Sequence, residues 1–150
     1  MNKTLVILIL VVIVLSWNFI FTDKKKVELT DAARVLQGLS QAIQYKIAVK
    51  DYWKEKKNLP DAETWINEGK KIDIDFSRSL VKNIEVGVDA SGAVTVYFTN
   101  KETIPIEKNI DGTKIVLIPE VKGERLVWSC SGTMDEAYMP KKCKKEVISN

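Results

Sequence analysis

The first part of the chain contains an apolar run that restricts where the protein can reside. There is no charged residue from Thr4 to Thr22, and the run ends abruptly at a lysine triplet, residues 24–26. As an α-helix, the run would be roughly 28 Å long, which is close to the hydrocarbon thickness of a bilayer. The sequence therefore predicts one membrane-spanning helix, represented by Thr4, Leu5, Ile7, Leu10, Ile13, Trp17 and Phe21.

A removable secretory signal is the alternative interpretation of the same run. Lys3 would be its basic start, and residues 14–16 would provide a tolerable cleavage site. The apolar character continues past Ser16 to Phe21, however, which favours an uncleaved anchor over a signal peptide.

A second, amphipathic helix is predicted directly after the lysine triplet, over residues 27–57. Thr30 or Asp31 is expected to cap its start, and Pro60 follows its end. Gly38 is a weak position in this helix, costing up to about 1 kcal/mol relative to alanine. Apolar residues recur at spacings of three, four and seven and predict one buried stripe: Val35, Leu39, Ala42, Val49 and Trp53.

The period of the pattern changes after this helix. Residues 58–79 read as a connecting loop with a helical turn from Ala62 to Asn67, which Trp65 anchors to the body. Residues 80–130 then alternate between apolar and polar side chains, as in a half-buried sheet. Four strands are expected, around Ile84 to Val88, Val94 to Phe98, Ile115 to Ile118 (ended by Pro119) and Leu126 to Cys130.

These elements predict an α+β fold in which the amphipathic helix packs on a four-stranded antiparallel sheet. The chain of 150 residues then divides into a membrane segment, residues 1–26, and one globular head, residues 27–150. Within the head, a disulfide loop is expected at 130–143 and a basic tail at 144–150.

Composition argues against catalysis. The chain has no histidine, which removes the commonest general base and metal ligand. It also lacks a glycine-rich phosphate loop, a nucleophile elbow and a CxxC motif. We expect neither enzymatic activity nor a cofactor, a metal ion or a small-molecule substrate. The net charge of +3 is too mild to demand an acidic partner.

Two features stand out near the C-terminus. Cys130 and Cys143 are the two cysteines of the chain and follow a membrane segment, which predicts one disulfide in an oxidising compartment, with two reduced, buried thiols as the alternative.

A basic patch surrounds the second cysteine, with Tyr138 nearby. A solvated tail is its simplest interpretation, and DNA capture is a weaker one. The patch comprises Lys141, Lys142, Lys144 and Lys145.

Several stretches of the chain together resemble a type IV pilin. Residues 35–40 and 46–53 are similar to the second half of a pilin spine helix. Residues 112–119, then Val127-Trp128-Ser129-Cys130, then Tyr138-Met139-Pro140 before Cys143, resemble the last strands and the disulfide-closed loop of such pilins. The resemblance implies a subunit or minor component of a pilus used for adhesion, motility or DNA uptake. It also implies other pilins or the assembly machinery as partners.

The N-terminal part departs from the family pattern. Ile7 falls where pilins carry a glutamate in the apolar helix, and no glycine-ended leader precedes Lys3. An alternative function follows, in which the protein is retained in the membrane and modulates pilus assembly without being polymerised. In either case we expect a single-pass inner-membrane protein with its head in the periplasm or outside the cell. The lysine triplet alone would place the head in the cytoplasm, and the cysteines oppose that orientation.

Overall fold

The computed structural model of the chain describes residues 30–68 and 72–145, which are called the head below. The apolar run from Thr4 to Thr22 lies outside these described residues. Within them, no helix is long and apolar enough to cross a membrane. The membrane-spanning helix therefore stays a prediction of the sequence.

The longest element of the head is helix α2, Asp31–Lys56. Thr30 caps its start, because its side-chain oxygen accepts a hydrogen bond from the Ala33 N–H at 3.3 Å. Lys57 ends the helix in a left-handed conformation and donates its N–H to the Trp53 carbonyl at 2.8 Å. Both bonds satisfy groups at the helix ends that lack partners within the helix. The expectation of a cap at Thr30 is confirmed.

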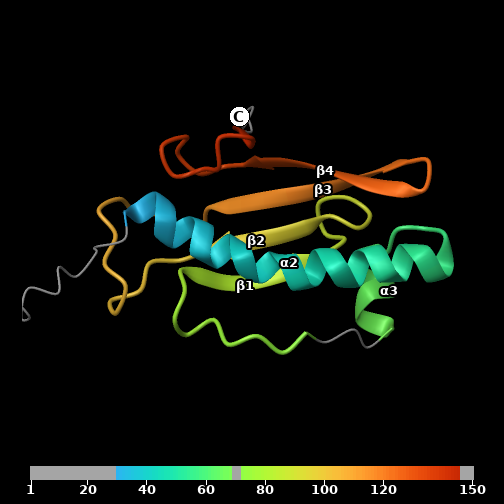
Figure 1. Cartoon of the computed structure of the whole chain (residues 1–150). Helices are drawn as coiled ribbons and strands as arrows, with labels where there is room; N and C mark the ends of the chain where they lie inside the picture. Colours follow the sequence, from blue (N-terminus) through green and yellow to red (C-terminus); the bar gives the residue numbers. More distant parts are fainter. Residues whose placement is uncertain (1–29, 69–71, 146–150) are drawn as a thin grey trace, which may run out of the picture.

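The strands form one sheet in which sequence order and spatial order are the same. The first four are antiparallel, and the short last strand pairs parallel to the fourth. In Figure 1, α2 lies across one face of this sheet. The predicted α+β fold is confirmed, and the fifth strand is an addition to it. The strands are β1 Val81–Val86, β2 Val94–Phe98, β3 Lys114–Lys122, β4 Arg125–Gly132 and β5 Lys144–Lys145.

The core lies between α2 and the face of the sheet that it covers. Val35, Ala42 and Val49 of the predicted helical stripe are completely buried. Removing a side chain the size of valine from water contributes roughly 1.5–3 kcal/mol, so the burial of Val35 and Val49 stabilises this contact. The sheet residues of the same cluster include Val81, Val94, Val96, Phe98 and Ile115.

A second, short helix connects α2 to the sheet. This is α3, Ala62–Asn67, and the Asp61 carboxylate caps it by accepting a hydrogen bond from the Thr64 N–H at 2.8 Å. Trp65 is 7% exposed and belongs to the core cluster. The predicted helical turn and the anchoring role of Trp65 are both confirmed.

Two predicted core positions are wrong. Val88 is half exposed, because β1 ends at Val86 and Gly87 turns the chain with a φ of 80°. In α2, the buried stripe continues from Val49 to Tyr52, which is 3% exposed, and Trp53 lies only half buried at its margin.

The predicted end of the third strand is also wrong. β3 continues through Pro119 and pairs with β4 as far as Lys122. Proline lacks the backbone N–H through which a residue of a central strand bonds to one of its two neighbouring strands. The last residue of β3 that pairs with β2 is Leu117, opposite Val94. Pro119 therefore lies beyond the beginning of β2, where no hydrogen bond on that side is lost.

Gly38 has a packing role that the sequence pattern did not reveal. A Cβ atom at this position would lie 2.9 Å from Val81 Cγ2 and 3.4 Å from Phe98 Cε1. Real Cβ atoms do not approach a neighbour as closely as the first distance, and Val81 is fully buried and has little room to move. The glycine therefore allows α2 to approach β1 and β2 closely.

We predict that Gly38→Ala destabilises the head although alanine is the better helix former. The overpacking against Val81 should cost about 1–3 kcal/mol, which exceeds the gain in helix propensity of up to about 1 kcal/mol. Thermal unfolding of the full chain, followed by circular dichroism, measures the effect. Gln44→Ala, at an exposed position of the same helix, is the control and should change stability little. An unchanged or raised melting temperature for Gly38→Ala would contradict tight packing at this contact.

Candidate functional site

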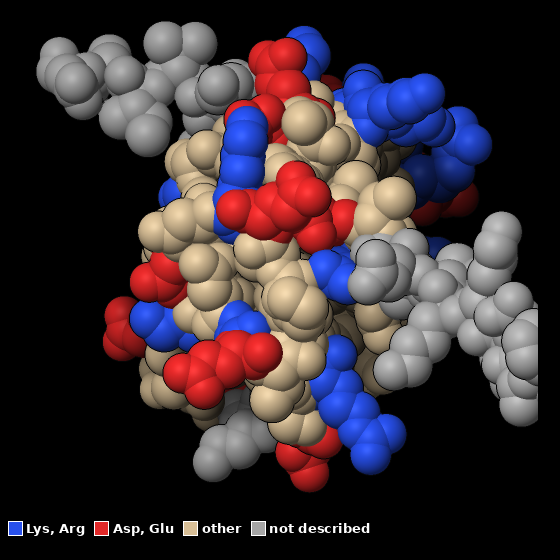
Figure 2. All heavy atoms as spheres, turned by 90° about the vertical axis from the view of Figure 1, so that its left-hand side faces the viewer, with Lys and Arg blue, Asp and Glu red and all other residues tan. Residues whose placement is uncertain are grey.

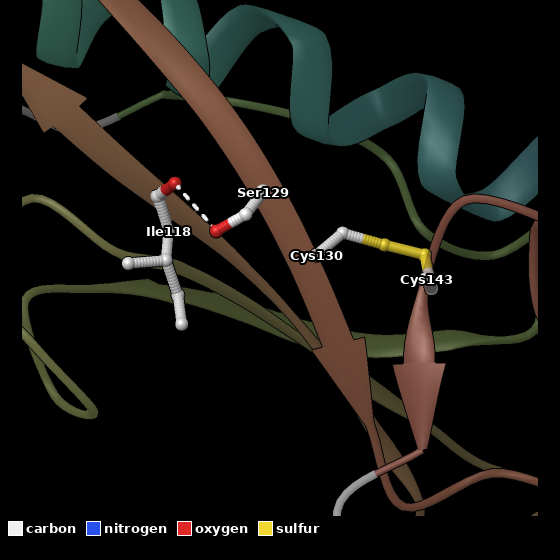
Figure 3. Close-up of a disulfide and its surroundings, with 4 residues drawn as sticks. All are labelled: Ile118, Ser129, Cys130 and Cys143. Carbon is white, nitrogen blue, oxygen red and sulfur yellow. Dashed lines mark hydrogen bonds between the residues drawn. A yellow bond between two sulfur atoms is a disulfide. The ribbon is translucent and has the colours of Figure 1, made fainter. Parts of the chain in front are cut away.

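The last edge of the sheet is closed by a disulfide between Cys130 and Cys143, drawn in Figure 3. Cys130 belongs to β4, and Cys143 directly precedes β5. The two Cα atoms are 4.6 Å apart although the residues are 13 positions apart in the chain. The bond therefore holds the beginning of β5 against β4, and the disulfide predicted from the sequence is present.

The loop between the two cysteines is packed onto the core. Met134 is completely buried and Met139 is 7% exposed, and both belong to the core cluster. The Asp135 carbonyl accepts the Tyr138 N–H at 2.9 Å, and the Pro140 carbonyl accepts the Cys143 N–H at 2.8 Å. The disulfide loop is thus a folded part of the head with its own turns and buried side chains.

The predicted basic patch lies around the end of this loop. Lys141 and Lys142 are exposed on the turn before Cys143, and Lys144 is exposed on β5. Lys145 also belongs to β5. The structure does not show Tyr138 stacked with these lysines. Its ring instead faces Lys108, whose Nζ lies 5.8 Å from the ring centroid.

The end of the head where α2 begins is held together by polar contacts. The Asp31 carboxylate pairs with Arg34 at 3.1 Å and accepts the Glu107 N–H at 2.9 Å. Arg34 also donates to the Pro105 carbonyl. These bonds fasten the segment between β2 and β3 to the first turn of α2, beside a hollow of about 650 Å³. Acidic and basic side chains lie intermingled on this face rather than in one large patch (Figure 2).

A polar cluster lies on the face of the sheet away from α2. The Asp89 carboxylate accepts a hydrogen bond from the Thr95 hydroxyl at 2.7 Å and forms an ion pair with Lys114. Partial burial acts to raise the pKa of Asp89, but the hydrogen bonds from Lys114 and Thr95 outweigh it and lower the pKa below its usual value. Thr95 is completely buried, so the cluster closes the β1–β2 turn over the sheet.

This cluster is structural in character. Its carboxylate oxygens are engaged by the ion pair with Lys114 and by the hydrogen bond from the Thr95 hydroxyl, both of which hold the turn in place. Within the described residues there is no group of three or more side chains suited to holding a metal ion.

The head thus combines an antiparallel sheet covered by one long helix with a disulfide-closed loop at its last edge. The sequence model of the pilin family, described as a bacterial filament protein, matches residues 33–144, and the chain belongs to this family. The match spans α2 except for its first two residues, the four antiparallel strands and the disulfide loop. Pilins are structural proteins and not enzymes. A search of curated proteins found no match.

We predict that the double variant Cys130→Ser/Cys143→Ser is less stable than the wild type by about 3 kcal/mol, because a short loop loses its cross-link. Urea unfolding of the full chain measures this difference. As a control, the wild type treated with reductant should unfold like the variant. Free-thiol labelling of unreduced, denatured wild type should find no reactive cysteine. Labelling of both cysteines would contradict the bond.

We also predict that Asp89→Asn lowers stability at neutral pH, with a difference from the wild type that disappears in acid. The folded state lowers the pKa of Asp89, so its contribution is full above the unfolded pKa of about 3.9 and is lost as pH falls through the folded pKa. Melting temperatures of both proteins between pH 7 and pH 2 test this. Asp51→Asn, at an exposed helical position, should show no such convergence. A difference that stays constant with pH would exclude the ionised carboxylate as its cause.

Proposed function

We propose that this protein is a structural subunit or minor component of a type IV pilus, with its apolar run among those of other subunits and its head at the filament surface. The observation that carries the proposal is the pilin match over residues 33–144, which coincides with the helix-on-sheet head and its disulfide loop. In this proposal the filament serves adhesion, motility or DNA uptake, and the molecules that it binds determine which.

In this proposal the membrane is a partner of the protein, and the run from Thr4 to Thr22 is the segment that enters it. Before assembly, it anchors the subunit in the inner membrane as a single span, and the head lies in the periplasm or outside the cell. The disulfide supports this orientation, because such bonds persist in oxidising compartments. The lysine triplet at residues 24–26 would favour the opposite orientation, but its excess of positive charge over Lys3 is small, so the disulfide is the stronger argument.

A second function is favoured by one specific residue. Ile7 stands where the family carries a glutamate, so the apolar run offers no carboxylate to a neighbouring subunit. Apolar packing alone distinguishes poorly between lipid tails and adjacent apolar helices. The alternative proposal is therefore a membrane-retained pilin that binds other pilins or the assembly machinery and modulates pilus assembly.

DNA capture by the basic patch is a weaker proposal. Lys141, Lys142 and Lys144 are exposed and supply positive charge for a phosphate backbone. Single-stranded nucleic acid is usually held by aromatic stacking as well, and in this head Tyr138 faces Lys108 instead.

We predict that the full-length protein, carrying a small C-terminal tag, is found in filaments sheared from cells that make pili. Immunoblotting of the sheared fraction and of the membrane fraction measures its distribution. An inner-membrane protein that does not belong to the pilus is the control for contamination. If the protein stays wholly in the membrane while filaments still form, the subunit proposal is wrong and the membrane-retained function is supported.

The variant Ile7→Glu separates the two functions further. If the missing carboxylate limits assembly, Ile7→Glu raises the share of the protein in sheared filaments. Ile13→Glu places the same charge elsewhere in the run and should not raise that share, since a carboxylate in hydrocarbon without a partner is costly. If both variants changed the share in filaments equally, the missing carboxylate at position 7 would not be what limits assembly.

A further inference from the structure

A groove runs along one side of α2, between that helix and the β3–β4 hairpin. It has a volume of about 480 Å³. Ile43 and Ile47 of α2 are 54% and 55% exposed and form one wall, and Leu126 and Trp128 of β4 lie half buried in the other. Ile43 and Ile47 are four residues apart, so their exposed side chains lie on one face of α2.

The rim of this groove is strongly basic. Lys50 and Lys54 of α2 and Arg125 of β4 line it and are exposed, whereas Glu124 is the one acidic residue in the lining. None of the three basic side chains forms an ion pair with a described residue. Lys46 lies deeper, with its Nζ 4.8 Å from the centroid of the Trp128 ring. The groove therefore suits an apolar side chain flanked by carboxylates.

The opposite edge of the head carries a surface of that kind. Helix α3 lies against β1, at the far end of the sheet from β4, as Figure 1 also shows. Its Ile66 is 75% exposed, the highest exposure of any large hydrophobic residue in the described part of the chain. Residues 61–68 contain three carboxylates, Asp61, Glu63 and Glu68, and no basic residue. Asp61 caps α3 and Glu68 pairs with Lys56, whereas Glu63 forms no ion pair with a described residue.

We propose that a second copy of this chain occupies the groove, with Ile66 between Ile43 and Ile47 and with Glu63 against the lysines of the rim. The inference rests on the proposed function and adds the surface by which neighbouring heads meet. Charge complementarity selects the occupant, because the basic groove and the acidic α3 surface lie on opposite edges of one molecule. A contact between two different surfaces leaves each of them free on the outermost copies. Such an interface can add further copies, and it produces an open array unless the rotation between copies closes a ring.

Cysteine cross-linking of full-length protein in membranes and in sheared filaments tests this contact. The chain has two cysteines and they are bonded to each other, so an introduced cysteine supplies the free thiol for a short bismaleimide reagent. One tagged copy carries Ile47→Cys and a second, differently tagged copy carries Ile66→Cys. We expect an adduct that contains both tags. The matched control is Val127→Cys, which is 44% exposed on β4 beside the groove-lining residues but on the other face of the sheet. It should give little or no adduct with Ile66→Cys.

Charge reversal provides the second arm of the test. Lys50→Glu and Glu63→Lys should each reduce the yield of the adduct at least several-fold, and the two changes placed in opposite copies should restore it. The proposal is overturned if no adduct forms, if the control pair reacts equally, if the Ile47→Cys copy is cross-linked to a different protein instead, or if charge reversal has no effect.

Fractionation of the same cells distinguishes this inference from the proposed function. Filaments that contain the chain without the adduct would leave the subunit function standing and remove the groove contact. An adduct formed only in membranes, with the chain absent from filaments, would support the contact and remove the subunit function.

Discussion

The close approach of α2 to β1 and β2 is the contact on which the rest of the head depends. At Gly38 the helix lacks a side chain, and Val81 and Phe98 fill the space. On either side of this point, Val35 and Ala42 lie fully buried against the sheet. Because α2 lies so close to the sheet at Gly38, the helix faces on either side of this contact point to opposite edges of the sheet. One of these faces forms the groove beside β4.

The other contacts of the head fasten its periphery to this central layer. Asp31 and Arg34 tie the segment between β2 and β3 to the first turn of α2. Trp65 packs the connection after α2 into the core, and the disulfide links the chain just before β5 to β4. Asp31 and Arg34 pair through side chains that are only 12% and 19% exposed. The effect of these peripheral contacts is to fix where the loops lie, and hence which surfaces a neighbouring molecule meets.

The sequence predicted the helix, the antiparallel strands and the disulfide because each depends on local or simple patterns. The helical stripe and the alternation of the strands both follow from burial on one side. Pro119 was misjudged because its tolerance depends on where β2 begins, which is a property of the assembled sheet. The groove was missed for a similar reason. Ile43 and Ile47 are ordinary helix residues until the position of Trp128 opposite them is known. The Asp89 cluster likewise joins residues from a turn and two strands.

Strand β5 has a consequence for how the head behaves at high concentration. The outer edge of a sheet presents unpaired backbone groups that invite another strand. At this edge the chain supplies its own two-residue strand, bonded through Cys143 and made of Lys144 and Lys145. The opposite edge strand, β1, has a register shift between Val81 and Asn83, with exposed Lys82 between them. Irregular pairing and lysines at both edges discourage backbone pairing between heads, so crowded copies are steered away from amyloid-like stacking and toward contacts between side chains.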